Sequence, residues 1–459
     1  MSSDWKTYTL GELGTIKTGK TPPSSLGDGF GGTVPFVTPG DMNGQKWITD
    51  TDRCLNERGL ASVSSSLMPA RSVAVSCIGS DMGKASLLAR PSVTNQQINT
   101  IAVDESRFNA EFVYYDLSVR QQELKAAASG SATPILNKGH FSAFEISIPP
   151  RATQDKITEI LGKLDDRIAV NRRINQTLEA MAQAIFQSWF VDFDPVKAKI
   201  AAKAEGRDPL RAAMCAISGK ADAELDALPP EQYEQLAATA VLFSDEMEES
   251  ELGEIPKGWI AGNLGDICNF TAGSAFSPEH QGSAEGDYPF IKVSDMNLVG
   301  NEVFIQSANN YVSQARQLEM KAKLHPQGAT VFAKIGVALI SNRRRLLITP
   351  TIIDNNMMSA SPIEGKSAPY FLYSMLSTID FNTLVSGTAL PYLNVSDLRK
   401  IPIVRPLDDV CRAFELKAAS IFLMMQKLAA QSVTLASVRS ALLPKLLSGE
   451  IEVSGLDEG

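Results

Sequence analysis

Residues 154–189 have the sequence QDKITEILGKLDDRIAVNRRINQTLEAMAQAIFQSW, and residues 412–446 repeat its apolar pattern. The pattern recurs at intervals of three and four residues, which places it on one face of a helix, as in a coiled-coil seam. No Gly or Pro follows Gly162 in the first stretch, so this helix is expected to span roughly 54 Å. The predicted seam residues are Leu161, Leu164, Ile168, Asn171, Leu178, Ile185, Ile421, Met425, Leu428, Leu435 and Leu442.

The two stretches are related by an offset of 257 residues. We predict that they pack on each other as long antiparallel helices, with the segments near Leu164 and Ile421 in one shared interface. Asn171 and Asn175 lie inside the stripe, where polar residues cost stability but fix register and orientation. Pro444 is expected to kink or stop the second helix. The alternative is two unrelated amphipathic helices in separate cores.

The repeat extends beyond the helices. At an offset of 254 residues, and later of 257, the same Trp, Gly, Pro, Asn and apolar residues recur. Such residues set turns and cores, so the scaffold is duplicated while its surface chemistry varies. The matched pairs include Trp5 with Trp259, Leu10-Gly11 with Leu264-Gly265, Gly19 with Gly273, Asn43 with Asn297, Ile78-Gly79 with Ile335-Gly336, Ser129-Gly130 with Ser386-Gly387, and Leu136-Asn137 with Leu393-Asn394.

The chain order predicts an α/β (α+β) fold with two duplicated domains joined by two long helices, related by a pseudo-twofold. Short strand signals at 34–37, 72–75 and 145–148 are punctuated by Gly and Pro. An aromatic and acidic turn at 190–195 should stop the first helix, and residues 196–220 have helical composition. The predicted boundaries are 1–152 for the first domain, 153–190 for the first helix, 191–256 for a connector, 257–408 for the second domain and 409–459 for the second helix and tail.

Charge is distributed unevenly along the chain. The 459 residues carry a net charge of −9, but residues 221–256 hold eleven acidic residues and no Lys, Arg or His. The remainder has 43 basic and 41 acidic groups. A balanced domain binds DNA when its basic groups converge on one face, so bulk charge alone gives no support for DNA binding. We expect the acidic connector to lie away from any DNA, or against a partner.

The cysteine pattern and the apolar runs indicate a compartment. The cysteines are odd in number and never in CxxC spacing, which argues against a disulfide framework and a structural zinc site and suits a reducing environment. Residues 1–10 lack a signal-peptide pattern. The longest apolar runs, around Val241 and Phe422, are shorter than the ~20 residues of a membrane span. We therefore expect a cytoplasmic protein without a membrane span.

Three catalytic patterns fit the residues poorly. Residues 14–21 match the phosphate-binding pattern GxxxxGK[ST], but prolines follow where the pattern needs a helix, and the repeat lacks the lysine. Asp192, Asp194 and Lys197 suggest a nuclease site, although a helix stop with docking aromatics explains them better. The histidines have no ligand-spaced partners and are expected at the surface; they are His140, His280 and His325.

Basic residues are the remaining candidates for function. Arg343, Arg344 and Arg345 lie between two apolar runs and are predicted to form the tip of a hairpin, where arginine suits contact with guanine edges or phosphates. A solvated hairpin tip is the alternative. The full set of candidate DNA-binding residues is Lys20, Lys84, Lys138, Lys334, Arg343, Arg344 and Arg345.

Two variable domains, each followed by a long helix in a duplicated chain, resemble the specificity subunit of type I restriction-modification systems. The resemblance covers nearly the whole chain, and the order and duplication of its motifs make it specific. The supporting stretches are Trp5 with Leu10-Gly11, residues 129–137 (SGSATPILN), Ile148-Pro149-Pro150, residues 190–195 (FVDFDP), residues 253–259 (GEIPKGW) and residues 446–451 (LLSGEI).

The resemblance implies that each domain is a target-recognition domain for one half of a bipartite double-stranded DNA site. It implies that the helices hold the domains apart as a ruler and dock two methyltransferase subunits, and that restriction subunits with motor and nuclease activity join this core. S-adenosylmethionine would bind the methyltransferase subunits and ATP the restriction subunits. No cofactor or metal, and no catalytic residue, is expected in this chain.

Two alternatives stay open on the residues alone. The first alternative is a nucleotide hydrolase that uses Gly19, Lys20 and Thr21. The second is a scaffold whose duplicated domains bind proteins rather than DNA. Loss of ATP turnover when Lys20 is replaced would favour the first, and absence of DNA binding would favour the second. The DNA target itself is not encoded in any recognisable pattern, because base contacts depend on loop geometry.

Overall fold

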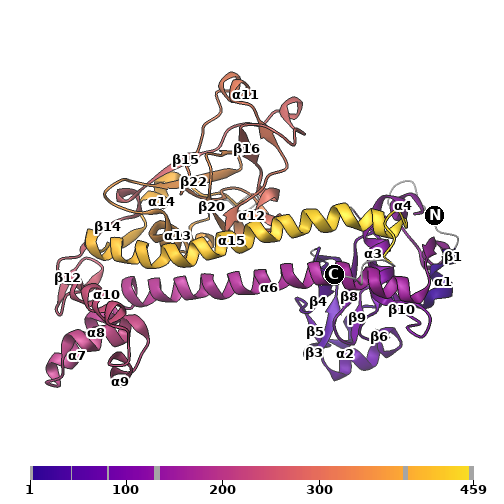
Figure 1. Cartoon of the computed structure of the whole chain (residues 1–459), viewed down its shortest axis with the longest axis horizontal. Helices are drawn as coiled ribbons and strands as arrows, with labels where there is room; N and C mark the ends of the chain where they lie inside the picture. Colours follow the sequence, from indigo (N-terminus) through magenta and orange to yellow (C-terminus); the bar gives the residue numbers. More distant parts are fainter. Residues whose placement is uncertain (1–3, 43, 80–81, 129–134, 386–390, 454–459) are drawn as a thin grey trace. The chain divides into compact units, whose positions relative to one another are not determined.

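The computed structural model describes residues 4–42, 44–79, 82–128, 135–385 and 391–453. The chain forms two compact units (Figure 1). Unit 1 contains Met1–Arg167 and Leu435–Gly459, and unit 2 contains Ile168–Thr434. Several predicted features lie outside the described residues, namely Asn43, Ser129-Gly130, Pro134, Ser386-Gly387 and the tail at 454–459.

Unit 1 is built on a five-stranded sheet whose central strands are buried on both faces. Its strand order is β2 (Gly14–Thr18), β10 (Ile98–Val103), β7 (Val73–Ser76), β8 (Ala85–Leu88) and β4 (Trp47–Ile48). All neighbours are antiparallel except β4 and β8, which run parallel. Two further sheets have the orders β5 (Cys54–Leu55), β3 (Phe30–Val37), β9 (Ser92–Thr94), β6 (Leu67–Met68), and β1 (Lys6–Thr9), β11 (Glu145–Ile148).

Short helices cover these sheets. Helix α3 packs on β7 and β8 with an almost wholly apolar face, so Phe112, Val113 and Leu117 are fully buried. The short helices of unit 1 are α1 (Leu10–Leu13), α2 (Glu57–Ser62), α3 (Ala110–Val119), α4 (Gln121–Ala126) and α5 (Lys138–Ala143), with 3-10 turns at Ser24–Leu26, Pro39–Asp41 and Ser64–Ser66.

Unit 2 repeats this topology. Its five-stranded sheet has the order β15 (Cys268–Ala272), β22 (Met357–Pro362), β19 (Thr330–Ala333), β20 (Arg344–Leu347) and β17 (Phe304–Ile305), and again only the last pair is parallel. The smaller sheets are β18 (Tyr311–Val312), β16 (Tyr288–Ile291), β21 (Ile352–Ile353), and β14 (Ile260–Asn263), β23 (Pro402–Arg405). The same strand order in both units confirms the predicted duplication.

Among the helices of the second domain, α13 is the counterpart of α3. They are α11 (Gln314–Glu319), α12 (Val337–Ile340), α13 (Pro369–Thr378) and α14 (Val395–Arg399), with 3-10 turns at Leu264–Asp266, Pro278–His280, Val293–Asn297 and Phe381–Leu384.

The connector is folded. As predicted, the first long helix stops at the aromatic turn, where Phe193 adopts a left-handed conformation (φ 57°) and contacts the Trp259 ring edge-on at 5.6 Å. The acidic segment contributes the last two helices of the connector and a hairpin. The elements of the whole connector are α7 (Asp194–Ala204), α8 (Pro209–Ser218), α9 (Asp222–Leu225), α10 (Pro230–Val241), β12 (Met247–Ser250) and β13 (Gly253–Pro256).

The two long helices, α6 (Arg151–Phe190) and α15 (Asp408–Leu447), each contain 40 residues (Figure 1). Within unit 2, the side-chain amide of Asn171 donates to Gln431 Oε1 at 3.0 Å and to Ser432 Oγ at 3.3 Å. That of Asn175 donates to the Met425 carbonyl at 3.1 Å. Partner numbers fall as α6 numbers rise, so the helices are antiparallel, and the asparagines set their register.

The predicted seam residues differ in exposure. Leu161, Ile168, Asn171, Met425 and Leu428 are buried, whereas Leu164, Leu178, Ile185, Ile421, Leu435 and Leu442 are half-buried. Leu164 belongs to unit 1, whereas Ile421 packs against the core of unit 2. The expectation that Pro444 stops α15 is wrong, since the helix continues to Leu447.

One described helix, α15, is long and apolar enough by length and composition to cross a membrane. However, Phe414, Phe422 and Met425 are fully buried in the core of unit 2. A core helix of a soluble protein meets the same length and composition criteria, and 28% of the apolar window of α15 is buried in the structure.

Candidate nucleic-acid interface

The strand register of unit 1 gathers several predicted residues at one end of the five-stranded sheet. The last residue of β2, Thr18, pairs with Asn99 near the start of β10. The start of β10 pairs with the end of β7, which in turn pairs with the start of β8. Lys20, which follows β2, and Lys84, which precedes β8, therefore lie at the same end of the sheet. We call it the Gly79 end, formed by residues 19–21, 77–79, 82–84, 95–98 and 135–138.

Lys138 lies at this end because Leu136, two residues before it, is hydrogen-bonded to the sheet. The Leu136 N–H donates to the Cys77 carbonyl at 3.0 Å, and the Leu136 carbonyl accepts from the Asn99 side chain at 3.0 Å. Lys138 is then the first residue of α5. Lys20 and Lys138 are exposed and Lys84 is half-buried. Three cations from distant parts of the sequence thus gather at one end of the sheet.

Unit 2 has the equivalent Gly336 end, formed by residues 272–274, 333–336, 343–344, 354–357 and 391–394. The register again aligns the end of β15, the start of β22, the end of β19 and the start of β20. Lys334 follows β19, and its carbonyl accepts from the Leu393 N–H at 2.9 Å, as Cys77 does from Leu136. Gly79 and Gly336 both adopt positive φ, 87° and 80°, which favours glycine at this turn.

The prediction that Arg343, Arg344 and Arg345 form a hairpin tip is wrong. Residues 337–340 form α12, and Arg344 begins strand β20. Short apolar runs suit a buried helix turn as well as a strand, and here the backbone at Gly336 favours the helix. Of the three arginines, only Arg343 is exposed; it lies at the Gly336 end and donates to the Asn297 side chain.

The other two arginines serve the fold. Arg344 is buried, donates to the Ile379 carbonyl and lies 4.2 Å from the centroid of the Phe381 ring. Burial lowers the pKa of Arg344 to about 10. Arg345 donates to the Met296 carbonyl at 3.1 and 3.3 Å. The printed hydrogen bonds of both side chains go to backbone carbonyls of the protein, so the candidate interface of unit 2 rests on Lys334 and Arg343.

Each end also carries a pair of side-chain amides that the sequence analysis missed. Gln96-Gln97 precede β10, and Asn355-Asn356 precede β22. Both turns contain the same hydrogen bond from a backbone N–H to a side-chain oxygen two residues earlier. The Gln97 N–H donates to Asn95 Oδ1 at 3.0 Å, and the Asn356 N–H donates to Asp354 Oδ1 at 2.9 Å. Amides are suited to adenine edges. The signal was present as an amide pair at equivalent places of the repeat.

The GxxxxGK[ST] residues have a structural explanation. Residues Gly14–Thr18 form β2 rather than a phosphate-binding loop. A Cβ at Gly19 would meet the Asn95 carbonyl oxygen at 2.1 Å, and one at its repeat Gly273 would meet that of Asp354 at 1.9 Å. Glycine is therefore required by close backbone approach at the sheet end. This also explains why Gly19 recurs while Lys20 does not.

The remaining candidates from the sequence are the aspartates near 192–194 and the three histidines. Asp194 begins α7, and Asp192 accepts from Gln187 at 3.1 Å, so both belong to the helix stop. His140 is exposed and His280 half-buried, but the expectation that His325 is a surface residue is wrong, since it is 1% exposed. No group of three or more His, Cys, Asp or Glu within the described ranges is arranged to hold a metal ion.

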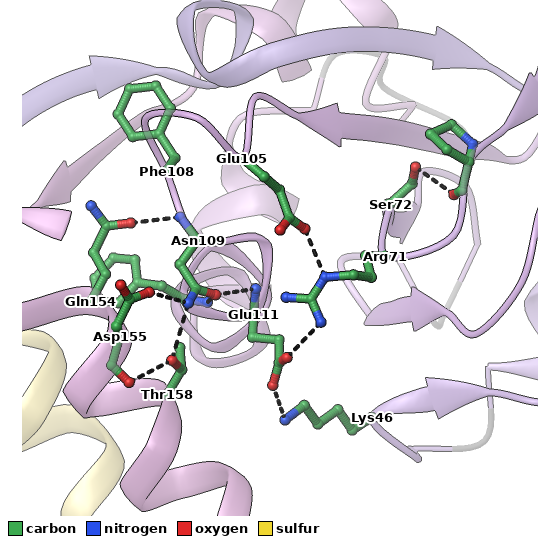
Figure 2. A network of polar contacts seen from close by, with 12 residues as sticks. Lys46, Arg71, Ser72, Glu105, Phe108, Asn109, Glu111, Gln154, Asp155 and Thr158 are labelled. Atoms are coloured by element: carbon green, nitrogen blue, oxygen red, sulfur yellow. Dashed lines mark hydrogen bonds and ion pairs between the residues drawn. The ribbon is translucent and has the colours of Figure 1, made fainter. Parts of the chain in front are cut away.

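A polar network attaches the unit 1 domain to α6 (Figure 2). The Asn109 side chain accepts from the first N–H groups of α3 and donates to Asp155 at 2.7 Å and Thr158 at 3.2 Å. The Asn109 N–H donates to Gln154 Oε1 at 2.8 Å. One residue thus caps α3 and joins it to three residues of α6, so the domain is held on the helix by directional bonds.

Proteins similar in sequence are specificity subunits. The type I restriction enzyme HindI specificity subunit of Haemophilus influenzae is 31% identical over 98% of this chain and 100% of its own length. The MjaIX specificity subunit of Methanocaldococcus jannaschii is 25% identical over 99% and 95%. Among solved structures, the type I restriction-modification S subunit from M. genitalium covers 97% of both chains at 16% identity, with a TM-score of 0.49.

The sequence model described as "Type I restriction modification DNA specificity domain" matches twice, over residues 2–180 and 256–410. The two matches together span most of the chain, one in each half of the duplication. The predicted family resemblance is confirmed, and the chain belongs to the specificity subunits of type I restriction-modification systems.

Proposed function

We propose that this subunit recognises a bipartite double-stranded DNA site, with one half-site bound at the Gly79 end and the other at the Gly336 end. The observation that carries the proposal is the recurrence of one surface in both units. Each has basic residues of which at least one is exposed, an amide pair and the same glycine turn at the same end of the same sheet. Lysine and arginine contact phosphates, while amides and arginine distinguish base edges.

The long helices supply the distance between half-sites in this proposal. A 40-residue helix spans about 60 Å. Half-sites one helical turn apart are ~34 Å centre to centre, which is within that reach. Asn171 and Asn175 fix the register of α6 and α15 by hydrogen bonds, so the helix pair has one defined alignment.

The helices also offer surface to protein partners. Exposed apolar side chains on α6 are Val170, Ile174 and Met181, and on α15 Leu416, Leu423 and Met424. Exposed apolar groups on a helix favour protein contact. We assign this surface to two methyltransferase subunits of a cytoplasmic complex that restriction subunits complete. S-adenosylmethionine and ATP belong to those partners, and the subunit itself is non-catalytic.

Lengthening the helix pair tests the proposal. One heptad is inserted after Arg167 and one after Thr434, where the chain passes from one unit to the other, which preserves the seam phase and adds about 10.5 Å. The preferred spacer should lengthen by about three base pairs at 3.4 Å each, with both half-site sequences unchanged. The measurement is a gel shift of the complex with methyltransferase subunits on duplexes of graded spacer, using half-sites mapped by sequencing methylated genomic DNA.

The control is a heptad inserted after Glu251, in the turn of the exposed β12–β13 hairpin, which should leave the spacer unchanged. Binding should weaken steeply with salt, since phosphate contacts release counterions. A preferred spacer that stays the same in the lengthened helix pair would contradict the ruler. Absence of any shift by the unaltered complex would favour the protein scaffold instead.

A further inference from the structure

A continuous chain of polar contacts crosses unit 1 from the recognition domain to both long helices. Its domain part runs from Glu105 to Arg71 at 2.7 Å, from Arg71 to Glu111 at 2.9 Å and from Glu111 to Lys46 at 2.6 Å (Figure 2). Charges alternate in sign along these contacts, so each group is stabilised by the next.

The chain then reaches the helices through a tyrosine. Lys46 Nζ donates to the Tyr115 hydroxyl at 2.9 Å, and that hydroxyl donates to Asp165 of α6 at 2.6 Å. The other oxygen of Asp165 is 2.5 Å from the Arg439 guanidinium of α15. The seven residues, which we call the polar chain, are Glu105, Arg71, Glu111, Lys46, Tyr115, Asp165 and Arg439.

The centre of the polar chain is withdrawn from water. Lys46, Tyr115 and Asp165 are 9%, 2% and 9% exposed. The ammonium of Lys46 also lies 4.7 Å from the centroid of the Tyr115 ring. Burial, followed by the Asp165 charge, raises the pKa of Tyr115, so its hydroxyl stays protonated and donates to Asp165.

The surrounding contacts between domain and helices are apolar. Ile157 and Leu161 of α6 and Leu443 and Leu446 of α15 pack in the core of unit 1. Apolar contact is non-directional and permits small shifts of one element on another. A buried ion pair adds little net stability over a hydrophobic pair, but its fixed geometry specifies register. The polar chain therefore orients the domain more than it stabilises it.

We propose that Lys46, Tyr115, Asp165 and Arg439 are positioning residues that fix the first recognition domain on the helix pair and thereby set how strictly the half-site spacing is discriminated. This inference rests on the proposed function, because it assigns to the polar chain the rigidity that a ruler requires. None of the four residues is assigned a contact with DNA. Their loss changes spacing tolerance, and the half-site sequences stay the same.

The test replaces the Asp165–Arg439 pair by apolar residues of similar size, Asp165→Leu with Arg439→Met, in the full chain assembled with its methyltransferase subunits. Preference for the native spacer over spacers one base pair longer or shorter should fall about tenfold, the scale of a typical coupling between two sites. Affinity at the native spacer should change little. Gel shifts on duplexes bearing the mapped half-sites measure both quantities.

Tyr115→Phe is the second variant, because it keeps the packed ring and removes both bonds of the hydroxyl. It should also weaken the preference for the native spacer. The separate variant Arg439→Lys, which keeps the charge opposite Asp165, should retain most of that preference. The matched control is Glu159→Gln, which breaks the exposed Glu159–Lys163 pair on the same helix and should change nothing.

The outcomes separate the two proposals. If the unaltered complex shows no preference for any spacer, the bipartite ruler is wrong. If it discriminates and Tyr115→Phe, folded by circular dichroism, discriminates equally well, the ruler stands and the positioning role of the polar chain is wrong.

Discussion

The two units hold equivalent helices by different chemistry. In unit 1, α3 begins at Asn109, whose side chain accepts from the Glu111 N–H at 2.9 Å and the Phe112 N–H at 3.3 Å. In unit 2, α13 begins after Ala368, which has no capping side chain. There Glu415 of α15 accepts from the Tyr370 N–H at 3.1 Å and the Phe371 N–H at 3.0 Å.

The difference shows how a duplicated fold diverges where domain meets helix. Every helix start leaves backbone N–H groups without partners, so both units must supply acceptors. Unit 1 uses a neutral local residue that Thr158 of α6 then supports. Unit 2 uses a half-buried carboxylate at the corresponding place of the other long helix, 257 residues after Thr158. The requirement is shared by the two units, and the residue that meets it is not.

Removing each cap should reveal this difference, and Glu415→Ala should have the larger effect. It removes two hydrogen bonds to a carboxylate, each worth roughly 2 kcal/mol, so unit 2 should lose about 4 kcal/mol of unfolding free energy. Asn109→Ala should cost unit 1 about 2 kcal/mol, the upper end for cap losses, because a neutral amide is lost together with its bonds to Asp155 and Thr158. Hydrogen exchange of peptides from α13 and α3 measures the two units separately. Equal loss of protection would contradict a special dependence of unit 2 on α15.

A buried histidine gives unit 2 a pH dependence that the equivalent residue of unit 1 does not supply. His325 Nδ1 is 2.6 Å from Ser359 Oγ, and Met68 stands at the equivalent place of unit 1, 257 residues earlier. Burial, with a smaller contribution from Lys323, lowers the pKa of His325 to about 4 from an ordinary 6.5. Because the unfolded chain takes up the proton first, this stability is complete above pH 6.5 and is lost as the pH falls towards 4.

Between pH 7 and pH 5 this group should remove about 2 kcal/mol from the unfolding free energy of unit 2. His325→Met, which copies the residue of unit 1, should abolish that loss. The measurement is hydrogen exchange of unit 2 peptides after pulses at the two pH values, with the same peptides of the His325→Met protein as the reference. A loss of the same size in the His325→Met protein would place its origin elsewhere.

The repeat and the helix pattern made much of the fold predictable. The strand at 145–148, the helix stop near Phe193 and the register role of Asn171 and Asn175 follow from local periodicity and turn chemistry. Duplication strengthened each inference, because a residue that recurs in a diverged surface is held by the scaffold. Gly79 and Gly336 are the clearest cases, since both have positive φ.

Contacts between distant residues were not predictable from local pattern. Asp165 and Arg439 each look like a solvated helix charge, and only antiparallel pairing of the helices brings them together. Arg344 sat in a run of exposed-looking arginines, but tertiary packing buries it against Phe381. His325 lacked ligand spacing, which excludes a metal pattern and says nothing about burial. In each case the partner was too far along the chain for periodicity to indicate it.

Each unit has a tyrosine that donates a hydrogen bond to an acidic residue of α6, and the two bonds should differ slightly in their contribution to stability. Tyr373 donates to Glu179 at 2.5 Å in unit 2, as Tyr115 donates to Asp165 in unit 1. Burial raises the pKa of Glu179, for which this bond is the main hydrogen bond. Tyr373→Phe should therefore cost about 2 kcal/mol, the scale of a hydrogen bond to a charged group.

Tyr115→Phe should cost only about 1 kcal/mol, because Asp165 keeps Arg439 and Lys46 keeps Glu111 when the hydroxyl is lost. Urea unfolding followed by hydrogen exchange in each unit gives the two values. Adding Glu179→Gln to Tyr373→Phe should recover part of the loss, since it removes the charge left without its donor. If Tyr115→Phe costs as much as Tyr373→Phe, Asp165 depends on its tyrosine as strongly as Glu179 does, and the redundancy that the polar chain gives to unit 1 is absent.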